Sequence, residues 1–175
     1  INSKSDMYLD DKNEVIRGLS QNGALAVGIP GTIAGLFEVH DKFGTLPIKE
    51  LFQPAIDLAS NGYRLTTKQV NTINNYKDLI LKLNDSIDLF NKNFEKNDLF
   101  INKPLAKTLK AISNNGVDEF YKGEIASKIS SYVIKKGGII TKEDFELYKP
   151  VWRESLELKY KNLNIITMGP PSSGG

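Results

Sequence analysis

The fold of this chain is decided by the stretch Gly28-Ile29-Pro30-Gly31-Thr32-Ile33-Ala34-Gly35-Leu36-Phe37-Glu38-Val39-His40-Asp41-Lys42-Phe43-Gly44. Proline is tolerated in the first turn of a helix, where its missing N–H has no partner, so Pro30 indicates a helix start. Ile33 then opens an i, i+3, i+4, i+7 pattern that ends at His40. We expect Gly44 to end the helix in the left-handed conformation that glycine tolerates. The stretch predicts an amphipathic helix at the start of a mainly helical chain.

Working outward, the same periodicity predicts helices over about 48–59, 67–83, 103–115 and 124–136, with one further turn at 117–121. Pro54 lies inside the first of these and would clash with the carbonyl four residues before it. We therefore expect two shorter helices that meet at Pro54. Thr141 and Asp144 form a near capping box that opens a short helix, which must stop before Pro150.

After Pro150 the period changes to two, which predicts strands over 151–158 and 163–168 around a turn at Lys161-Asn162. Residues 24–29 are expected to form a short buried strand or a loop pressed against a sheet. Residues 84–102 read as a partly ordered excursion whose phenylalanines, Phe90, Phe94 and Phe100, are tied to the body. The fold class is therefore mainly α with a short C-terminal β-hairpin, an α+β chain.

Composition excludes several classes of protein. The chain has 175 residues, 40% of them hydrophobic and 25% charged, which is typical of a globular domain and not of a disordered tail or a collagen-like repeat. Its 23 Lys and Arg residues against 21 Asp and Glu leave a net charge of +2 without a basic cluster, so nothing favours nucleic acid. The lack of cysteine and the single histidine exclude disulfides, thiolate chemistry and a multi-histidine metal site.

Candidate chemical groups have structural explanations that we favour. Residues 28–35 could bind an anion at a helix start, but they lack the Gly-Lys-Ser/Thr ending of a phosphate loop, and small residues also allow close helix packing. His40 could be a general base, yet its position favours a hydrogen-bonded, partly buried role. The acidic pairs Asp118-Glu119 and Glu143-Asp144 lie at helix starts, where negative charge meets the positive end of the helix dipole.

Ser172 and Ser173 are the most suggestive hydroxyls, because glycines follow them in a turn. A nucleophilic serine needs a base nearby, and the only histidine lies over a hundred residues away, so a tight turn is the preferred interpretation. The role of both serines stays open. The sequence therefore assigns no catalytic, cofactor-binding or metal-binding residue.

Several stretches, in order along the whole chain, share the pattern of one family. They are Asp6-Met7-Tyr8-Leu9-Asp10-Asp11, residues 28–35, Phe43-Gly44-Thr45-Leu46-Pro47, Gln53-Pro54-Ala55-Ile56 with Ala59-Ser60-Asn61-Gly62-Tyr63, Asp118-Glu119-Phe120-Tyr121-Lys122-Gly123, residues 137–144, and Pro170-Pro171-Ser172-Ser173-Gly174-Gly175. With this order and spacing, the chain resembles the central part of the large subunit of gamma-glutamyltransferase (gamma-glutamyl transpeptidase).

The resemblance implies an N-terminal-nucleophile hydrolase with an αββα fold, in which residues 1–175 form a single segment, the helical lobe of the large subunit. The intact enzyme would cleave gamma-glutamyl amides such as glutathione through an N-terminal Thr that lies outside this chain, and it would use no cofactor. The family's substrate-binding Arg and its catalytic Thr fall before and after the matching segment, so no catalytic residue carries over to this chain.

The first residue is Ile, and the last residues follow directly on a strand-like run, so we expect the chain to be a segment of a longer protein. Its partners would be the remainder of the large subunit and the small subunit, in a secreted, periplasmic or cell-surface enzyme. Helix faces built for those partners would favour self-association. Alternatives are a stand-alone helical interaction or scaffold domain, and a segment of a related acylase or poly-gamma-glutamate-processing enzyme.

Overall fold

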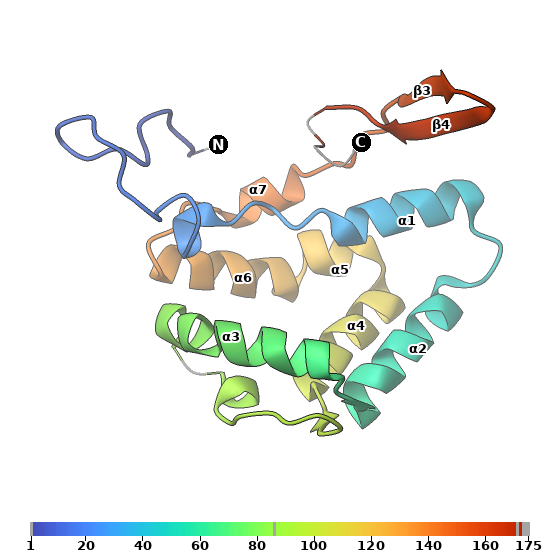
Figure 1. The fold of residues 1–175 in the computed structure, drawn as a ribbon, viewed down its shortest axis with the longest axis horizontal. Helices are drawn as coiled ribbons and strands as arrows, with labels where there is room; N and C mark the ends of the chain where they lie inside the picture. Colours follow the sequence, from blue (N-terminus) through green and yellow to red (C-terminus); the bar gives the residue numbers. More distant parts are fainter. Residues whose placement is uncertain (1, 86, 171, 173–175) are drawn as a thin grey trace.

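The computed structural model describes residues 2–85, 87–170 and 172, and it shows a mainly helical chain with a C-terminal hairpin, which confirms the predicted fold class (Figure 1). The helices are α1 (Thr32–Phe43), α2 (Ile48–Asn61), α3 (Thr67–Leu83), α4 (Lys103–Asn115), α5 (Val117–Tyr121), α6 (Glu124–Lys135) and α7 (Lys142–Glu146), with 3-10 turns η1 (Ala24–Ala26) and η2 (Asp88–Phe90). Antiparallel strand pairs join β1 (Tyr63–Arg64) to β2 (Leu99–Phe100) and β3 (Ser155–Tyr160) to β4 (Leu163–Met168).

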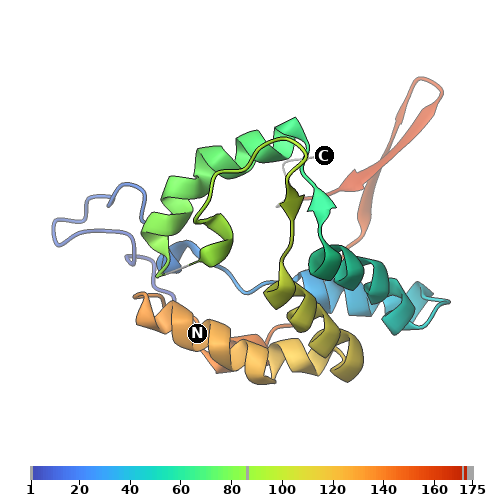
Figure 2. The same cartoon turned by 90° about the horizontal axis from the view of Figure 1, so that it is seen from below.

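The helices form a body from which the hairpin stands away. In Figure 1, α1 and α7 lie above α5 and α6, while α2 and α4 run along the right side and α3 lies below. Figure 2, turned by 90°, shows the β3–β4 hairpin projecting away from the helices in the second view as well. The hairpin therefore shares little surface with the body.

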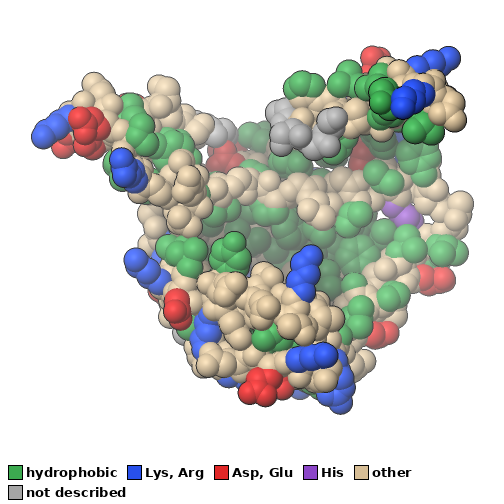
Figure 3. All heavy atoms as spheres, viewed as in Figure 1, with side chains coloured by type: hydrophobic (Ala, Val, Ile, Leu, Met, Phe, Trp, Pro, Cys, Tyr) green, Lys and Arg blue, Asp and Glu red, His purple; other side chains and the backbone are tan. Residues whose placement is uncertain are grey.

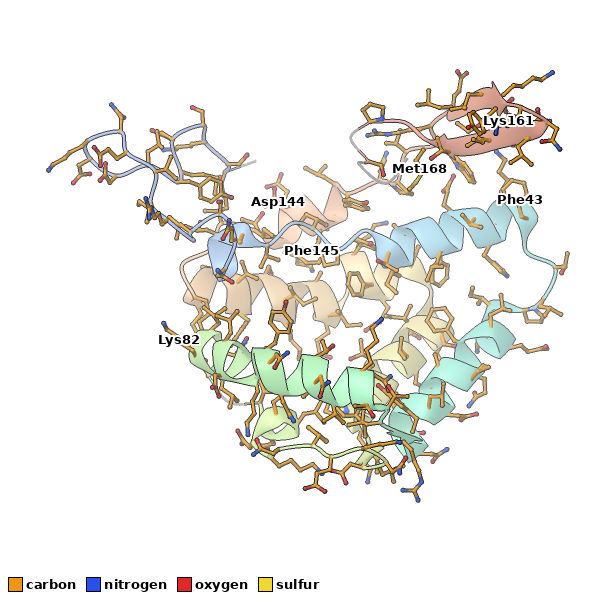
Figure 4. The ribbon with its side chains drawn as sticks, in the orientation of Figure 1. Phe43, Lys82, Asp144, Phe145, Lys161 and Met168 are labelled. Atoms are coloured by element: carbon orange, nitrogen blue, oxygen red, sulfur yellow. The ribbon has the colours of Figure 1, made fainter. Side chains whose placement is uncertain are left out.

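The main core gathers around α7, α5 and α6. Phe145 of α7 points between α1 and the helices beneath it (Figure 4), and its side chain has no exposed surface. Its ring centroid lies 6.2 Å from that of Phe120 and 6.4 Å from that of Tyr121. Ala34 of α1 belongs to the same buried cluster, so this core holds the first helix of the chain against helices more than eighty residues later.

A second, smaller core forms under α3, where Leu65, Val70 and Phe94 are buried together and Phe100 packs against them. Asn74 fixes the loop at Phe94, because its side-chain amide donates to the Phe94 carbonyl at 3.1 Å and its oxygen accepts from the Phe94 N–H at 3.4 Å. Two of the three aromatic residues of the 84–102 excursion are thus packed in this core, as expected.

Several predicted element boundaries are confirmed. The third helix covers Thr67–Leu83, and the fourth begins at Lys103 and ends at Asn115. The capping box is present, because the Thr141 hydroxyl accepts from the Asp144 N–H while the Asp144 carboxylate accepts from the Thr141 N–H. The hairpin turn lies at Lys161-Asn162, although its first strand begins four residues later than expected.

The prediction of a break at Pro54 is wrong, since α2 is continuous from Ile48 to Asn61. Proline removes one hydrogen bond from the helix. Buried residues on both sides of it, Phe52 and Ala59, pack the helix along its length, and α2 lies against α4. This packing across the proline outweighs the lost bond.

Two further expectations near α1 are also corrected. Gly44 is not left-handed but has φ −69°, and glycine is required there because a Cβ atom would overlap the ring and carbonyl of His40. Residues 24–29 do not form a strand. They begin with the 3-10 turn η1 and continue as extended chain with no ladder, because no strand lies beside them in the described part of the chain. The pair β1–β2, two residues in each strand, was not predicted.

Candidate functional site

The motif at residues 28–35 is held by a tyrosine from the far side of the core. The Tyr121 hydroxyl donates to the Pro30 carbonyl at 2.5 Å and accepts from the Ala34 N–H at 3.1 Å. It thereby binds one of the N–H groups that an anion would use at the start of α1. Burial raises the pKa of Tyr121, which keeps its hydroxyl protonated and able to donate.

The glycines of this motif allow close packing. A Cβ atom on Gly31 would overlap the hydroxyl of Tyr148, so no larger residue fits at position 31 without a shift. Tyr148 in turn stacks on Tyr121, with ring centroids 5.5 Å apart and 7° between the ring planes. The structural interpretation of the motif is supported by these contacts: the small residues bring α1 onto two tyrosines.

His40, the single histidine, is hydrogen-bonded and partly buried, as the sequence predicted. Its Nε2 donates to the Leu46 carbonyl at 2.8 Å, and its Nδ1 lies 3.9 Å from a carboxylate oxygen of Asp41. The bond to Leu46 closes the turn between α1 and α2. His40 therefore has a structural task that accounts for its position on the helix.

The acidic pairs also act at helix starts. Asp118 forms an ion pair with Lys122 at 2.9 Å, and Glu119 accepts from the Asn115 side chain at 3.0 Å. Asp144 caps α7, and the hydrogen bond from the Thr141 backbone is the largest cause that lowers its pKa to about 2. In the described residues, no group of three or more His, Asp or Glu side chains is placed to hold a metal ion.

Ser172 lies at the base of the hairpin. Its N–H donates to the Gly169 carbonyl at 3.2 Å, which is the bond of a tight turn. Ser172 and His40 line different cavities, so the structure forms no serine–histidine pair from them. Ser173 lies outside the described residues. The interpretation of this stretch as a turn is therefore supported at Ser172.

The most prominent concave feature is an apolar groove between α1 and α2, with a volume of about 540 Å³. Figure 3 shows the hydrophobic side chains gathered there, with the histidine at the edge. Leu36, Phe43 and Leu51 are roughly half exposed along it, and the polar side chains in its lining are Thr32 and His40. Such a surface suits another apolar protein surface better than a charged substrate. The sequence did not predict it, because α1 and α2 are each amphipathic but their angle is a tertiary property.

The 84–102 excursion is fixed to α6 by charge. The Asp85 carboxylate lies 2.7 Å from the Lys136 ammonium and 2.9 Å from that of Lys135, and the hydrogen bond from Lys136 is the main cause that lowers the pKa of Asp85 to about 2. These groups are on the surface and account for one another. No helix among the described residues has the length and apolar character to cross a membrane.

Sequence reasoning missed Tyr121 and Tyr148, which organise the motif around α1. The hydrogen bond between Tyr121 and Ala34 joins residues 87 positions apart, and nothing in a local pattern could pair them. The tyrosine at 121 was visible only as part of a stretch shared with a family. The functional content of the described structure is therefore a set of packing surfaces, with no assembled catalytic group.

Comparison with known proteins identifies the family to which these surfaces belong. The sequence profile described as Gamma-glutamyltranspeptidase matches residues 2–175. The glutathione hydrolase proenzyme of Pseudomonas aeruginosa is 40% identical over 97% of this chain, and the chain spans about 30% of that relative's length.

Solved structures agree. The gamma-glutamyltranspeptidase of Helicobacter pylori superposes with a TM-score of 0.94 at 40% identity, over 99% of this chain and 51% of its own. The Bacillus anthracis transpeptidase enzyme CapD reaches a TM-score of 0.76 at 33% identity, over 85% of this chain and 51% of its own.

Proposed function

The chain belongs to the gamma-glutamyltranspeptidase family, and from this premise we propose that it is a non-catalytic segment of a gamma-glutamyltransferase. The observation that carries the proposal is the pairing of two coverages. Nearly all of this chain matches the Pseudomonas aeruginosa relative, but it spans about 30% of that relative. The whole activity would then require polypeptide beyond the matched segment.

In the whole protein, the hydroxyl of an N-terminal Thr, freed by autoproteolysis, would attack a gamma-glutamyl amide such as glutathione. The alpha-amine of the same Thr would accept the hydroxyl proton and pass it to the leaving amine. Water or an acceptor amine would then release the glutamyl group. The printed name of the Pseudomonas aeruginosa relative, glutathione hydrolase proenzyme, supports this substrate and a precursor that is processed.

Residues 1–175 would form a single segment, the helical lobe of the large subunit. Its partners would be the remainder of that subunit and the small subunit. The groove between α1 and α2 supports this role, since its half-exposed leucines and phenylalanine suit a protein partner. The higher similarity to the Helicobacter pylori enzyme than to CapD favours a gamma-glutamyltransferase over the related enzymes.

The test compares the isolated chain with a chimera, in which this chain replaces the matching segment of the Pseudomonas aeruginosa proenzyme. We expect the isolated chain to release no chromophore from a gamma-glutamyl anilide above the buffer blank. We expect the chimera to process itself into two subunits and to hydrolyse the anilide. Turnover by the isolated chain that survives Ser172→Ala would overturn the proposal, because it would reveal a site within these residues.

A stand-alone interaction domain is the second candidate, and the exposed apolar groove is the observation that favours it. The same chimera separates the two. A chimera that is folded but never processed would favour the interaction domain, whereas processing and turnover would favour the transferase segment.

A further inference from the structure

The β3–β4 hairpin has one face that is almost entirely apolar. Its register pairs Leu156 with Thr167, Leu158 with Ile165, and Tyr160 with Leu163. Directly opposed residues of an antiparallel pair lie on the same face, and alternate residues along a strand share it. These six side chains therefore form one face, which we call the apolar hairpin face. The opposite face is mixed, with Ser155, Glu157, Lys159, Asn164, Ile166 and Met168.

The apolar hairpin face is not covered by the described part of the chain. Leu158 is 48% exposed, Tyr160 56% and Leu163 58%. A hairpin of two strands is marginally stable by itself in water and needs further strands or a packed layer on its apolar face. The sequence thus supplies a face that is suited to burial, and the structure leaves it in solvent.

The backbone edges of the hairpin are also open. Among the described residues, the sheet that contains β3 and β4 has no third strand, so each strand has an outer edge with unpaired N–H and C=O groups. Open edges of this kind are templates for another strand. The face and the edges together favour a β-structured, apolar partner over a small ligand.

The hairpin is held at its root instead of by its face. The Trp152 indole donates to the Glu38 carboxylate at 2.8 Å, and its ring meets that of Phe43 edge-on with centroids 5.9 Å apart. The Lys42 ammonium lies 4.2 Å from the Trp152 ring centroid. In Figure 4, Phe43 lies at the end of α1 beneath the hairpin, and Lys161 lies at the hairpin tip. These contacts place the hairpin beside α1 and leave its face free.

We propose that the apolar hairpin face is the docking surface for an apolar β-sheet segment, supplied by the polypeptide that longer family members carry outside the matched segment. The Helicobacter pylori enzyme superposes over 99% of this chain, a share that must include the hairpin, and this chain covers 51% of its length. The hairpin therefore keeps this position in a protein with as much polypeptide again to cover it. The inference rests on the proposed function and specifies one surface through which the segment joins the whole protein.

The absence of cysteine from the chain allows a direct test by thiol labelling. Leu158→Cys places a thiol on the apolar hairpin face, and Lys159→Cys, the matched control, places one on the opposite face of the same strand. In the isolated chain, we expect both thiols to react with a maleimide at similar rates. In the chimera, freed of other cysteines, we expect the thiol at position 158 to react at least about tenfold more slowly than the one at 159, because labelling then requires local opening.

Equal labelling at positions 158 and 159 in a chimera that is processed and active would overturn the docking surface while the proposed function stands. A chimera that is never processed counts against the proposed function, and the docking surface is then tested in the Pseudomonas aeruginosa proenzyme itself. Cysteines at the positions that align with 158 and 159 are labelled there, and equal rates overturn the inference. Protection of the thiol at 158 in the isolated chain that grows with protein concentration would also overturn it, since a second copy would then cover the face.

Discussion

The helical body and the C-terminal hairpin differ in how they bury their apolar residues. In the body, Phe145 has no exposed surface and Ile112 is 1% exposed. In the hairpin, Leu156, Leu158 and Ile166 are about half exposed or more, although the ladder between β3 and β4 is complete. Local hydrogen bonds therefore form in both regions, but stabilising burial occurs only where a second layer lies opposite. The difference separates what a pattern can build from what a partner must supply.

Truncation of one apolar residue in each region gives the largest expected contrast. Phe145→Ala should lower the free energy of unfolding by about 3–5 kcal/mol, because it removes a buried ring and leaves a cavity beside Phe120 and Tyr121. Leu158→Ala should change it by no more than about 0.5 kcal/mol, because the side chain is already in water. Urea unfolding followed by circular dichroism measures both. Equal losses would mean that the hairpin face is buried within the isolated chain.

A change of one hydroxyl should have an intermediate effect. Tyr121→Phe keeps the ring but leaves the Ala34 N–H and the Pro30 carbonyl without their partner, which should cost about 1–3 kcal/mol of unfolding free energy. The matched variant Tyr160→Phe on the exposed hairpin face should stay within about 0.5 kcal/mol of the parent chain. The same urea titration applies. If Tyr121→Phe proves as neutral as Tyr160→Phe, the tyrosine bridge does not hold α1 to the body.

The smallest expected effect is a pH dependence at the cap of α7, the helix that carries Phe145. The folded pKa of Asp144, about 2, lies below its ordinary value of 3.8, chiefly because its carboxylate accepts from the Thr141 backbone. A lowered folded pKa contributes stability that is complete above about pH 4 and is lost as the pH falls toward 2. An NMR titration of the Asp144 carboxyl should show the low pKa.

Two variants serve as controls for this cap. Asp144→Asn should flatten this part of the pH profile of stability. Thr141→Ala should raise the pKa of Asp144 toward its ordinary value, because the hydroxyl that also donates to the carboxylate is removed. A titration of Asp144 at its ordinary pKa in the parent chain would contradict the cap geometry.

Prediction from the sequence succeeded where the signal is local. The helix at Thr67–Leu83 and the turn at Lys161-Asn162 follow from periodicity and from turn residues within a few positions of one another. Thr141 and Asp144 are three residues apart, so their reciprocal cap could be recognised directly. The family was also identified from the sequence, because its motifs recur in order along the chain.

Prediction failed where distant residues decide the outcome. Pro54 breaks many helices, but here the buried side chains of Phe52 and Ala59 hold α2 straight through it. Gly44 was expected to be left-handed, yet its requirement comes from the closeness of the His40 side chain. For the candidate site, His40 was placed correctly as a hydrogen-bonded residue, whereas the groove that it borders depends on how α1 and α2 meet.

By itself, the sequence determined the helices, the amphipathic hairpin and the family. Only the tertiary structure decided that Tyr121 bridges Pro30 and Ala34, that α2 continues through Pro54, and that the hairpin face stays in solvent while Phe145 is buried. The physical reason is that periodicity and capping act over a few residues along the chain. Burial and side-chain bridges instead join residues that only the folded chain brings together, and an uncovered face records a partner that the local pattern cannot name.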